Sequence, residues 1–212
     1  MQHAPALTES DTAAQRLTAL SDGVFAIAMT LLVLDVSIPP GLNPEQFHEA
    51  LDDVLPNLAA YTISFAVIAE FWTDHRRILG SLRAVDGWVT GLTLLGLGLI
   101  ALLPFPTALL AEYGNESLPV AIYSLSVAAT NAVHLALLLA VQRRLPPPDQ
   151  PLGHRLRRLQ AADFASTVVM FGLAVPLAFA TPTGAKLFWA LLIPLKSWIG
   201  QWERSTTRRL KA

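Results

Sequence analysis

Long apolar segments dominate this chain, and they constrain its fold more than any other feature of the sequence. A bilayer core about 30 Å thick is crossed by a helix of roughly 20 apolar residues. Six segments reach or approach that length, and they cover residues 17–38, 55–72, 88–111, 118–141, 161–180 and 185–202. The last is the weakest, because Lys196 interrupts it. The sequence therefore predicts an all-α membrane protein with six transmembrane helices.

The composition agrees with this prediction and excludes several other classes of protein. Hydrophobic residues make up 53% of the chain and charged residues only 15%, against about 25% charged residues in soluble domains. The net charge of −1 provides no basic field for nucleic acid. The absence of cysteine excludes disulfides, thiolate metal sites and a cysteine nucleophile. No catalytic motif is present, so we expect no enzyme activity.

The basic residues indicate how the six segments cross the membrane. If each segment crosses once, 14 of the 15 lysines and arginines fall on one side of the membrane, and Lys186 falls on the other. The connection over residues 39–54 carries acidic residues instead. Because basic residues favour the cytoplasmic side, both termini are expected there. The chain then divides into a polar cytoplasmic N-terminus (1–15), a six-helix transmembrane domain (16–203) and a basic cytoplasmic tail (204–212).

Three short motifs occur in order along the first half of the chain. Arg16 precedes Ser21-Asp22 at the start of the first segment, Trp72 and His75 end the second, and Pro104-Phe105-Pro106-Thr107 lies late in the third. In these motifs the chain resembles the potassium channels of the transmembrane protein 175 family, found in endosomes and lysosomes and in many bacteria. Two positions depart from the family pattern, because Leu20 replaces a phenylalanine and Thr93 an asparagine.

The resemblance implies both a function and an assembly. Bacterial members of the family are tetramers of six-helix subunits, in which the first helix of each subunit lines a central pore. We therefore expect a passive, potassium-permeable homotetramer in a bacterial inner membrane, with K⁺ as the permeant ion and no cofactor or resident metal. The family's main constriction falls at Ile27, further pore-facing layers fall at Leu31 and Leu34, and a polar layer falls at Thr30.

The physical chemistry of these residues is compatible with a pore. Ile27, Leu31 and Leu34 follow the i, i+4, i+7 spacing that places side chains on one helical stripe. Four such stripes around an axis form a narrow apolar tube, which gates by dewetting. Asp35 follows at the expected outer mouth, where acidic residues concentrate cations. Spacing alone favours lipid contact or helix packing over a pore, because every membrane helix carries aliphatic residues at such intervals, and only the family resemblance favours the pore.

Arg16, Ser21 and Asp22 open the first segment and have two interpretations. Polar residues at a helix start often cap it or lie among lipid headgroups. Asp22, however, lies where the chain is already apolar, and a carboxylate at that depth needs a partner. Trp72 and His75 are the candidates. We interpret the five residues as a cluster that docks the first helix and sets its tilt, without contacting the ion.

Two further polar residues leave an alternative function open. His134 lies in the middle of the fourth segment, and Asp163 is expected in the first turn of the fifth helix. His134 suits either a proton relay or an interhelical hydrogen bond, whereas a helix end suits packing or interface contacts for Asp163. A small secondary or proton-coupled transporter that uses these two residues is the alternative to a channel. A membrane scaffold without flux is a third possibility.

Overall fold

The computed structural model describes residues 9–82, 86–146 and 151–190. Apart from short connections these residues form helices, namely α1 (Glu9–Leu31), the 3₁₀ helix η1 (Leu32–Asp35), α2 (Pro44–Leu79), α3 (Gly87–Leu102), α4 (Pro104–Glu112), α5 (Ser117–Arg144), α6 (Pro151–Ala180) and α7 (Pro182–Ala190). Within the described residues, five helical stretches are long and apolar enough to cross a membrane, and they cover Thr12–Asp35, Pro44–Leu79, Gly87–Glu112, Ser117–Arg144 and Gly153–Ala180. The predicted all-helical membrane architecture is confirmed.

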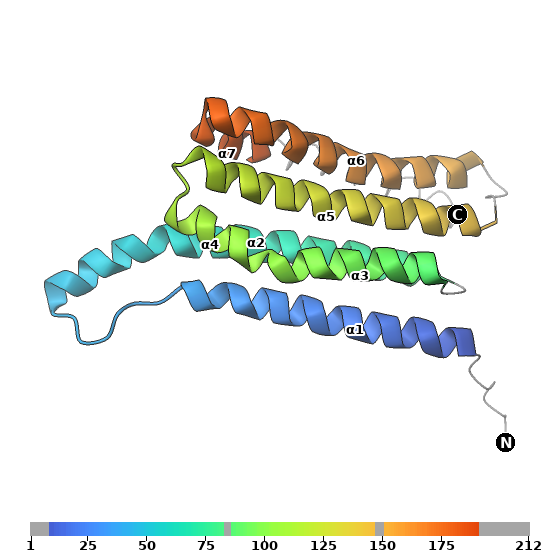
Figure 1. Ribbon diagram of the computed structural model, residues 1–212, viewed down its shortest axis with the longest axis horizontal. Helices are drawn as coiled ribbons and strands as arrows, with labels where there is room; N and C mark the ends of the chain where they lie inside the picture. The colour runs from blue at the N-terminus through green and yellow to red at the C-terminus, as the bar shows by residue number, and fades with distance from the viewer. Residues whose placement is uncertain (1–8, 83–85, 147–150, 191–212) are drawn as a thin grey trace, which may run out of the picture.

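The helices run side by side along the long axis of the molecule (Figure 1). α1 lies at one edge of the bundle and α6 at the other, with α2, α3 and α5 between them. α5 packs against both α3 and α6, and it contributes many of the fully buried side chains, such as Val120, Tyr123 and Leu137. Because α1 is an edge helix, one of its faces has no partner among the described residues of the subunit.

The first predicted segment differs from the structure at both ends. The helix already begins at Glu9, inside the segment assigned to a polar N-terminus, and its α-helical part ends at Leu31. The chain then tightens into η1, which ends where the N–H of Val36 donates to the carbonyl of Val33 at 3.0 Å. The prediction of one helix to Ile38 is therefore wrong beyond Asp35. Pro39 and Pro40 follow in the connection, and Gly41 turns the chain with φ 82°.

α2 is twice as long as the predicted second segment, because its N-terminus has a strong local start signal. The side chain of Asn43 accepts from the N–H of Gln46, and the Gln46 side chain accepts from the N–H of Asn43. This reciprocal capping box, with Pro44 in the first turn, starts the helix eleven residues before Leu55. Pro56 lies inside the helix without ending it.

Prolines also set the ends of the later helices. α3 stops at Leu102 and α4 begins at Pro104, so the predicted third segment is split where proline cannot continue the hydrogen-bond ladder. α6 begins at Pro151, ten residues before the predicted fifth segment. Asp163 therefore lies about three turns into that helix, and its assignment to the first turn is wrong. Of the sixth segment, residues 185–190 belong to α7, whereas residues 191–202 and the 204–212 tail lie outside the described residues.

Candidate functional site: the two faces of the first helix

α1 has one buried face, which holds it against the rest of the subunit. Leu17, Ser21, Phe25, Ala28 and Leu32 are all less than a tenth exposed, and they recur at intervals of three or four residues. This spacing places them on a single helical stripe. They pack toward α2 and α3, which both contact α1.

The exposed side of α1 carries the predicted pore residues. Ile27 is 61% exposed, Leu31 is 39% exposed and Leu34 is 70% exposed in the isolated subunit. Leu34 belongs to η1, where three residues complete one turn, so its side chain stays in line with that of Leu31. Thr30 is exposed as well, and its hydroxyl donates to the carbonyl of Ile27 at 2.9 Å. The threonine therefore presents only its acceptor lone pairs beside the stripe.

Asp35, the predicted outer-mouth residue, ends η1 and is exposed. Its backbone carbonyl accepts a hydrogen bond from Nδ2 of Asn57 on α2, at 2.9 Å. This contact anchors the end of the first helix to the neighbouring helix. The carboxylate of Asp35 is left in solution beside the exposed stripe.

Near the middle of α1, the structure brings four of the five predicted docking residues together. Nε1 of Trp72 donates to Oδ1 of Asp22 at 2.8 Å. The guanidinium of Arg76 lies over the Trp72 ring, 5.0 Å from its centroid. Arg16 is exposed, and in the described part of the chain no ion pair joins it to this cluster.

His75 contacts Ser21 rather than Asp22, and it continues the polar contacts into α5. Its Nε2 lies 3.1 Å from Oγ of Ser21, and its Nδ1 lies 3.2 Å from Nε2 of His134. Nδ1 of His134 in turn lies 2.9 Å from the carbonyl of Thr130. Ser21, His75 and His134 are all at most 2% exposed. A buried series of polar contacts, from Ser21 through His75 and His134 to Thr130, therefore links α1, α2 and α5.

The number of hydrogens in this series limits how its groups pair. The Thr130 carbonyl only accepts, so His134 must donate from Nδ1 and, when neutral, accept at Nε2 from His75. A neutral His75 then accepts at Nε2 from Ser21. The hydroxyl of Ser21 also lies 2.8 Å from the carbonyl of Leu17, but it has only one hydrogen. One added proton on His75 would supply a hydrogen to each polar contact in this series.

A second buried polar cluster was missed by the sequence reasoning. Thr107 of α4 donates to Oγ of Ser64 on α2 at 2.9 Å, and that oxygen lies 3.1 Å from the hydroxyl of Tyr123 on α5. The sequence feature that could have indicated this cluster is the threonine at the end of the Pro-Phe-Pro-Thr motif. Thr93 of α3 is also fully buried, and its hydroxyl has no hydrogen-bond partner within the described part of the chain.

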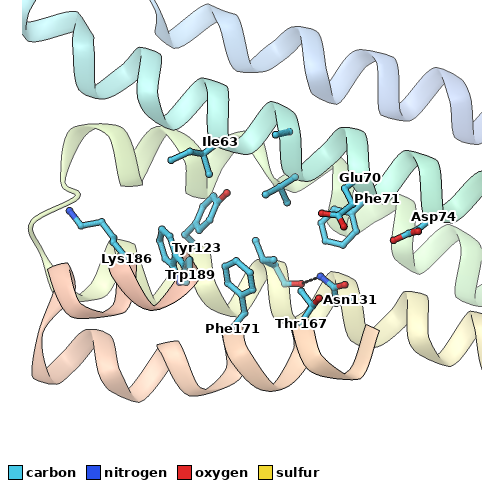
Figure 2. Close-up of a pocket in the computed structure, with 13 residues that line it drawn as sticks. Ile63, Glu70, Phe71, Asp74, Tyr123, Asn131, Thr167, Phe171, Lys186 and Trp189 are labelled. Carbon is cyan, nitrogen blue, oxygen red and sulfur yellow. Dashed lines mark hydrogen bonds between the residues drawn. The ribbon is translucent and has the colours of Figure 1, made fainter. Parts of the chain in front are cut away.

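A largely apolar cavity of about 560 Å³ lies between α2, α5, α6 and α7 (Figure 2). Phe71, Tyr123, Phe171 and Trp189 contribute aromatic surface to its walls. Figure 2 shows Lys186 and Asp74 at opposite ends, and Lys186 donates to the carbonyl of Gly114 at 2.7 Å. Asp163, which the sequence indicated as a candidate, lines a neighbouring cavity of about 150 Å³ that shares Asp74 with the first one. His134 lines neither of these two cavities, so neither of them brings together the two residues assigned to the alternative transporter function, His134 and Asp163.

Comparison with known proteins places these features in a family. Residues 16–104 match the family described as "Endosomal/lysosomal potassium channel TMEM175". A Streptomyces collinus protein named a potassium channel is 36% identical over 170 residues, which cover 78% of this chain and 82% of that protein. The chicken protein named "Endosomal/lysosomal proton channel TMEM175" is 35% identical over 111 residues, or 49% of this chain and 22% of the chicken protein.

A solved structure extends the similarity to the whole fold. The crystal structure of a protein described as a lysosomal potassium-selective channel TMEM175 homolog from Chamaesiphon minutus superposes with a TM-score of 0.74. The match covers 91% of this chain and 98% of that one, at 25% sequence identity. The likeness therefore includes the second half of the chain, where no motif was recognised.

Proposed function

Because this chain belongs to the TMEM175 family, a family of ion channels and not of enzymes, we propose that it is a passive, potassium-permeable channel. The exposed stripe of α1 carries this proposal. One face of α1 packs within the subunit through Phe25, Ala28 and Leu32. The exposed face needs lipid or other copies of the chain to cover it. Four copies arranged around that face enclose a pore.

In this arrangement Ile27 forms the constriction, and Leu31 and Leu34 form two further apolar layers. Their exposure in the subunit supports the assignment, because a residue that faces a central pore has no intrachain partner. Four copies of such an apolar layer form a ring, and a narrow apolar ring readily loses the water inside it. It favours potassium over sodium because potassium holds its hydration shell less tightly. The Thr30 hydroxyl oxygen, already bonded through its hydrogen to Ile27, offers an acceptor beside the conduction path.

The cluster of Ser21, Asp22, Trp72 and His75 positions α1 and does not contact the ion. Support comes from burial, because Ser21 and His75 are nearly inaccessible, and Ser21 lies on the buried face of α1, away from the stripe. Arg16 belongs to the same sequence motif, but its exposed side chain suits contact with headgroups at the cytoplasmic surface. The pore width then depends on how firmly these contacts hold the helix.

The assembly we propose is a homotetramer in the bacterial inner membrane, with both termini in the cytoplasm. One helix cannot enclose a pore, so copies of the chain must surround it. The last turn of α2 carries Arg76 and Arg77, and the last turn of α5 carries Arg143 and Arg144. These basic residues support a cytoplasmic location for the C-terminal ends of both helices. Asp35, at the opposite end of α1, then faces the outer mouth and attracts cations.

Flux measurements on purified protein in sealed vesicles test the proposal. With a protonophore present to carry the compensating charge, folded and assembled protein should release K⁺ down an outward gradient without any added substrate or nucleotide. Vesicles without protein give the background leak. An intact oligomer that leaves the K⁺ content of the vesicles unchanged would show that the chain is not a channel.

A proton-coupled carrier is the second candidate, and the buried contact between His75 and His134 favours it. The series of contacts from Ser21 to Thr130 accommodates one extra proton, and the cavity between α2 and α6 offers space for a substrate. A carrier saturates with substrate and moves protons in a fixed ratio to it. A pH-sensitive dye inside the vesicles separates the two functions. A carrier should move protons in the parent protein but not in His134→Leu, and it should give no passive K⁺ flux.

A further inference from the structure

The N-terminal part of α2 is longer than a membrane crossing requires. The helix has 36 residues, so it is about 54 Å long, whereas a bilayer core is about 30 Å thick. Arg76 and Arg77 in its last turn mark the end at one membrane surface. In Figure 1 its opposite end projects beyond the ends of α1, α5 and α6. The first turns of α2, residues 44–58, therefore extend past the other surface, and we call them the outer segment.

The outer segment has an apolar face without a partner in the described part of the subunit. Phe47, Leu51, Val54 and Leu58 follow one another at intervals of four, three and four residues. This is the spacing of core positions in a coiled coil. Phe47, Leu51 and Leu58 are each 45% exposed. The opposite face is acidic, and its residues are Glu45, Glu49, Asp52 and Asp53.

Lipid cannot cover this apolar face if the outer segment stands beyond the bilayer core. Exposed apolar surface of this kind on the aqueous side of a protein usually marks an interaction site. The hydrogen bond from Asn57 to the carbonyl of Asp35 ties the segment to the end of η1. Figure 1 also shows the segment inclined toward the side of the bundle on which α1 lies. Copies that meet along α1 would therefore bring their outer segments together.

We propose that the outer segments of neighbouring copies pack through Phe47, Leu51, Val54 and Leu58 into a collar over the outer mouth of the pore. The inference rests on the proposed function for the arrangement of copies around α1. The four side chains cover far less than the roughly 800 Å² per partner of a typical stable interface. The collar thus adds to the contacts within the membrane and does not replace them. The acidic faces stay in water, where they concentrate cations beside the mouth.

Disulfide cross-linking in membranes tests the collar, because the chain contains no cysteine of its own. Leu51→Cys in the full-length protein, oxidised in vesicles, should form a covalent dimer on a denaturing gel, and Phe47→Cys should do the same. Glu49→Cys lies two residues away on the opposite face and serves as the matched control. Cross-linking of Leu51→Cys and Phe47→Cys that is no greater than that of Glu49→Cys would overturn the collar.

A parallel variant, Ile27→Cys, separates failure of the collar from failure of the proposed pore. Dimers from Ile27→Cys but not from Leu51→Cys or Phe47→Cys would leave the pore intact and refute the collar. Dimers from Leu51→Cys but not from Ile27→Cys would support contact between outer segments and refute the arrangement around α1. Absence of dimers from all three variants would refute both, whereas we expect dimers from all three.

Discussion

Nε1 of Trp72 on α2 donates a hydrogen bond to Oδ1 of Asp22 on α1 over 2.8 Å, joining residues 50 positions apart in the sequence. Together with the contact between Ser21 and His75, it fixes the orientation of the middle of α1 against α2. The same orientation leaves Ile27 and Leu34 on the uncovered side. The position of a proposed pore lining is thus coupled to polar contacts that do not belong to it.

The hydrogen bond between Trp72 and Asp22 should be measurable by a double-mutant cycle. Trp72→Phe removes the donor and Asp22→Ala removes the acceptor. Hydrogen bonds to charged groups contribute about 1.5–3 kcal/mol, so each single variant should lose stability of that order. The double variant should lose less than the sum, because both changes delete one interaction. Thermal unfolding in detergent checks this, and strictly additive losses would contradict the contact.

His134 should stabilise the protein through His75. In His134→Leu, Nδ1 of His75 loses its partner in a buried site, which costs about 1–3 kcal/mol. The unfolding midpoint should fall accordingly. His154→Leu alters an exposed histidine on α6 and should change stability by less than about 0.5 kcal/mol. Equal midpoints for the two variants would mean that the histidine pair contributes nothing to stability.

The cluster of Thr107, Ser64 and Tyr123 predicts an effect far from α1. Thr107→Val removes the hydroxyl that donates to Ser64 and should destabilise the protein by about 1 kcal/mol or more. Thr62→Val is the matched control, because the exposed hydroxyl of Thr62 bonds only to the carbonyl of Leu58 in its own helix. Chemical denaturation distinguishes the two, and a larger loss for Thr62→Val would show that the buried cluster is not structural.

Asp86 predicts an acid-dependent contribution to stability at the start of α3. It caps α3 through the N–H of Val89 at 2.8 Å and pairs with Arg144 of α5. The hydrogen bond from Val89, followed by that from Arg144, lowers the pKa of the Asp86 carboxyl below its ordinary value. A depressed folded-state pKa means that this contribution is present above about pH 4 and is lost as the pH falls through the folded-state value.

In Asp86→Asn that acid dependence should disappear. The variant and the parent protein should differ in unfolding midpoint at neutral pH and converge as the solution is acidified toward the pKa of Asp86 in the folded protein. The difference should be small, because both side chains of the pair are exposed. A gap between the two midpoints that widens on acidification would contradict the assigned direction of the shift.

Much of the fold could be predicted from hydropathy and charge, because the bilayer imposes helix length and chemistry directly. The family assignment, made from Arg16, Ser21, Asp22 and two later motifs, is confirmed by the comparisons. Helix ends could not be predicted equally well. The start of α2 depends on the capping box at Asn43, and α6 begins at Pro151 in a stretch that hydropathy assigns to a polar connection.

The side-chain contacts were harder to predict than the helices. Trp72 and His75 were both expected near Asp22, but only the tertiary arrangement decides that His75 contacts Ser21 instead. His134 was considered as a lone residue, because nothing in the sequence places it beside a histidine of α2. Ser64 and Tyr123 carried no signal at all, since single hydroxyls in apolar helices are common.

The ion selectivity of Ile27→Asn tests the central claim most directly. In a planar bilayer with K⁺ on one side and Na⁺ on the other, the parent protein should give a reversal potential that favours K⁺. A polar amide at Ile27 hydrates the proposed constriction, so the potential should shift toward zero, while Leu94→Asn on the exposed face of α3 should leave it unchanged. An unaltered potassium preference in Ile27→Asn would contradict a constriction formed by the first helix.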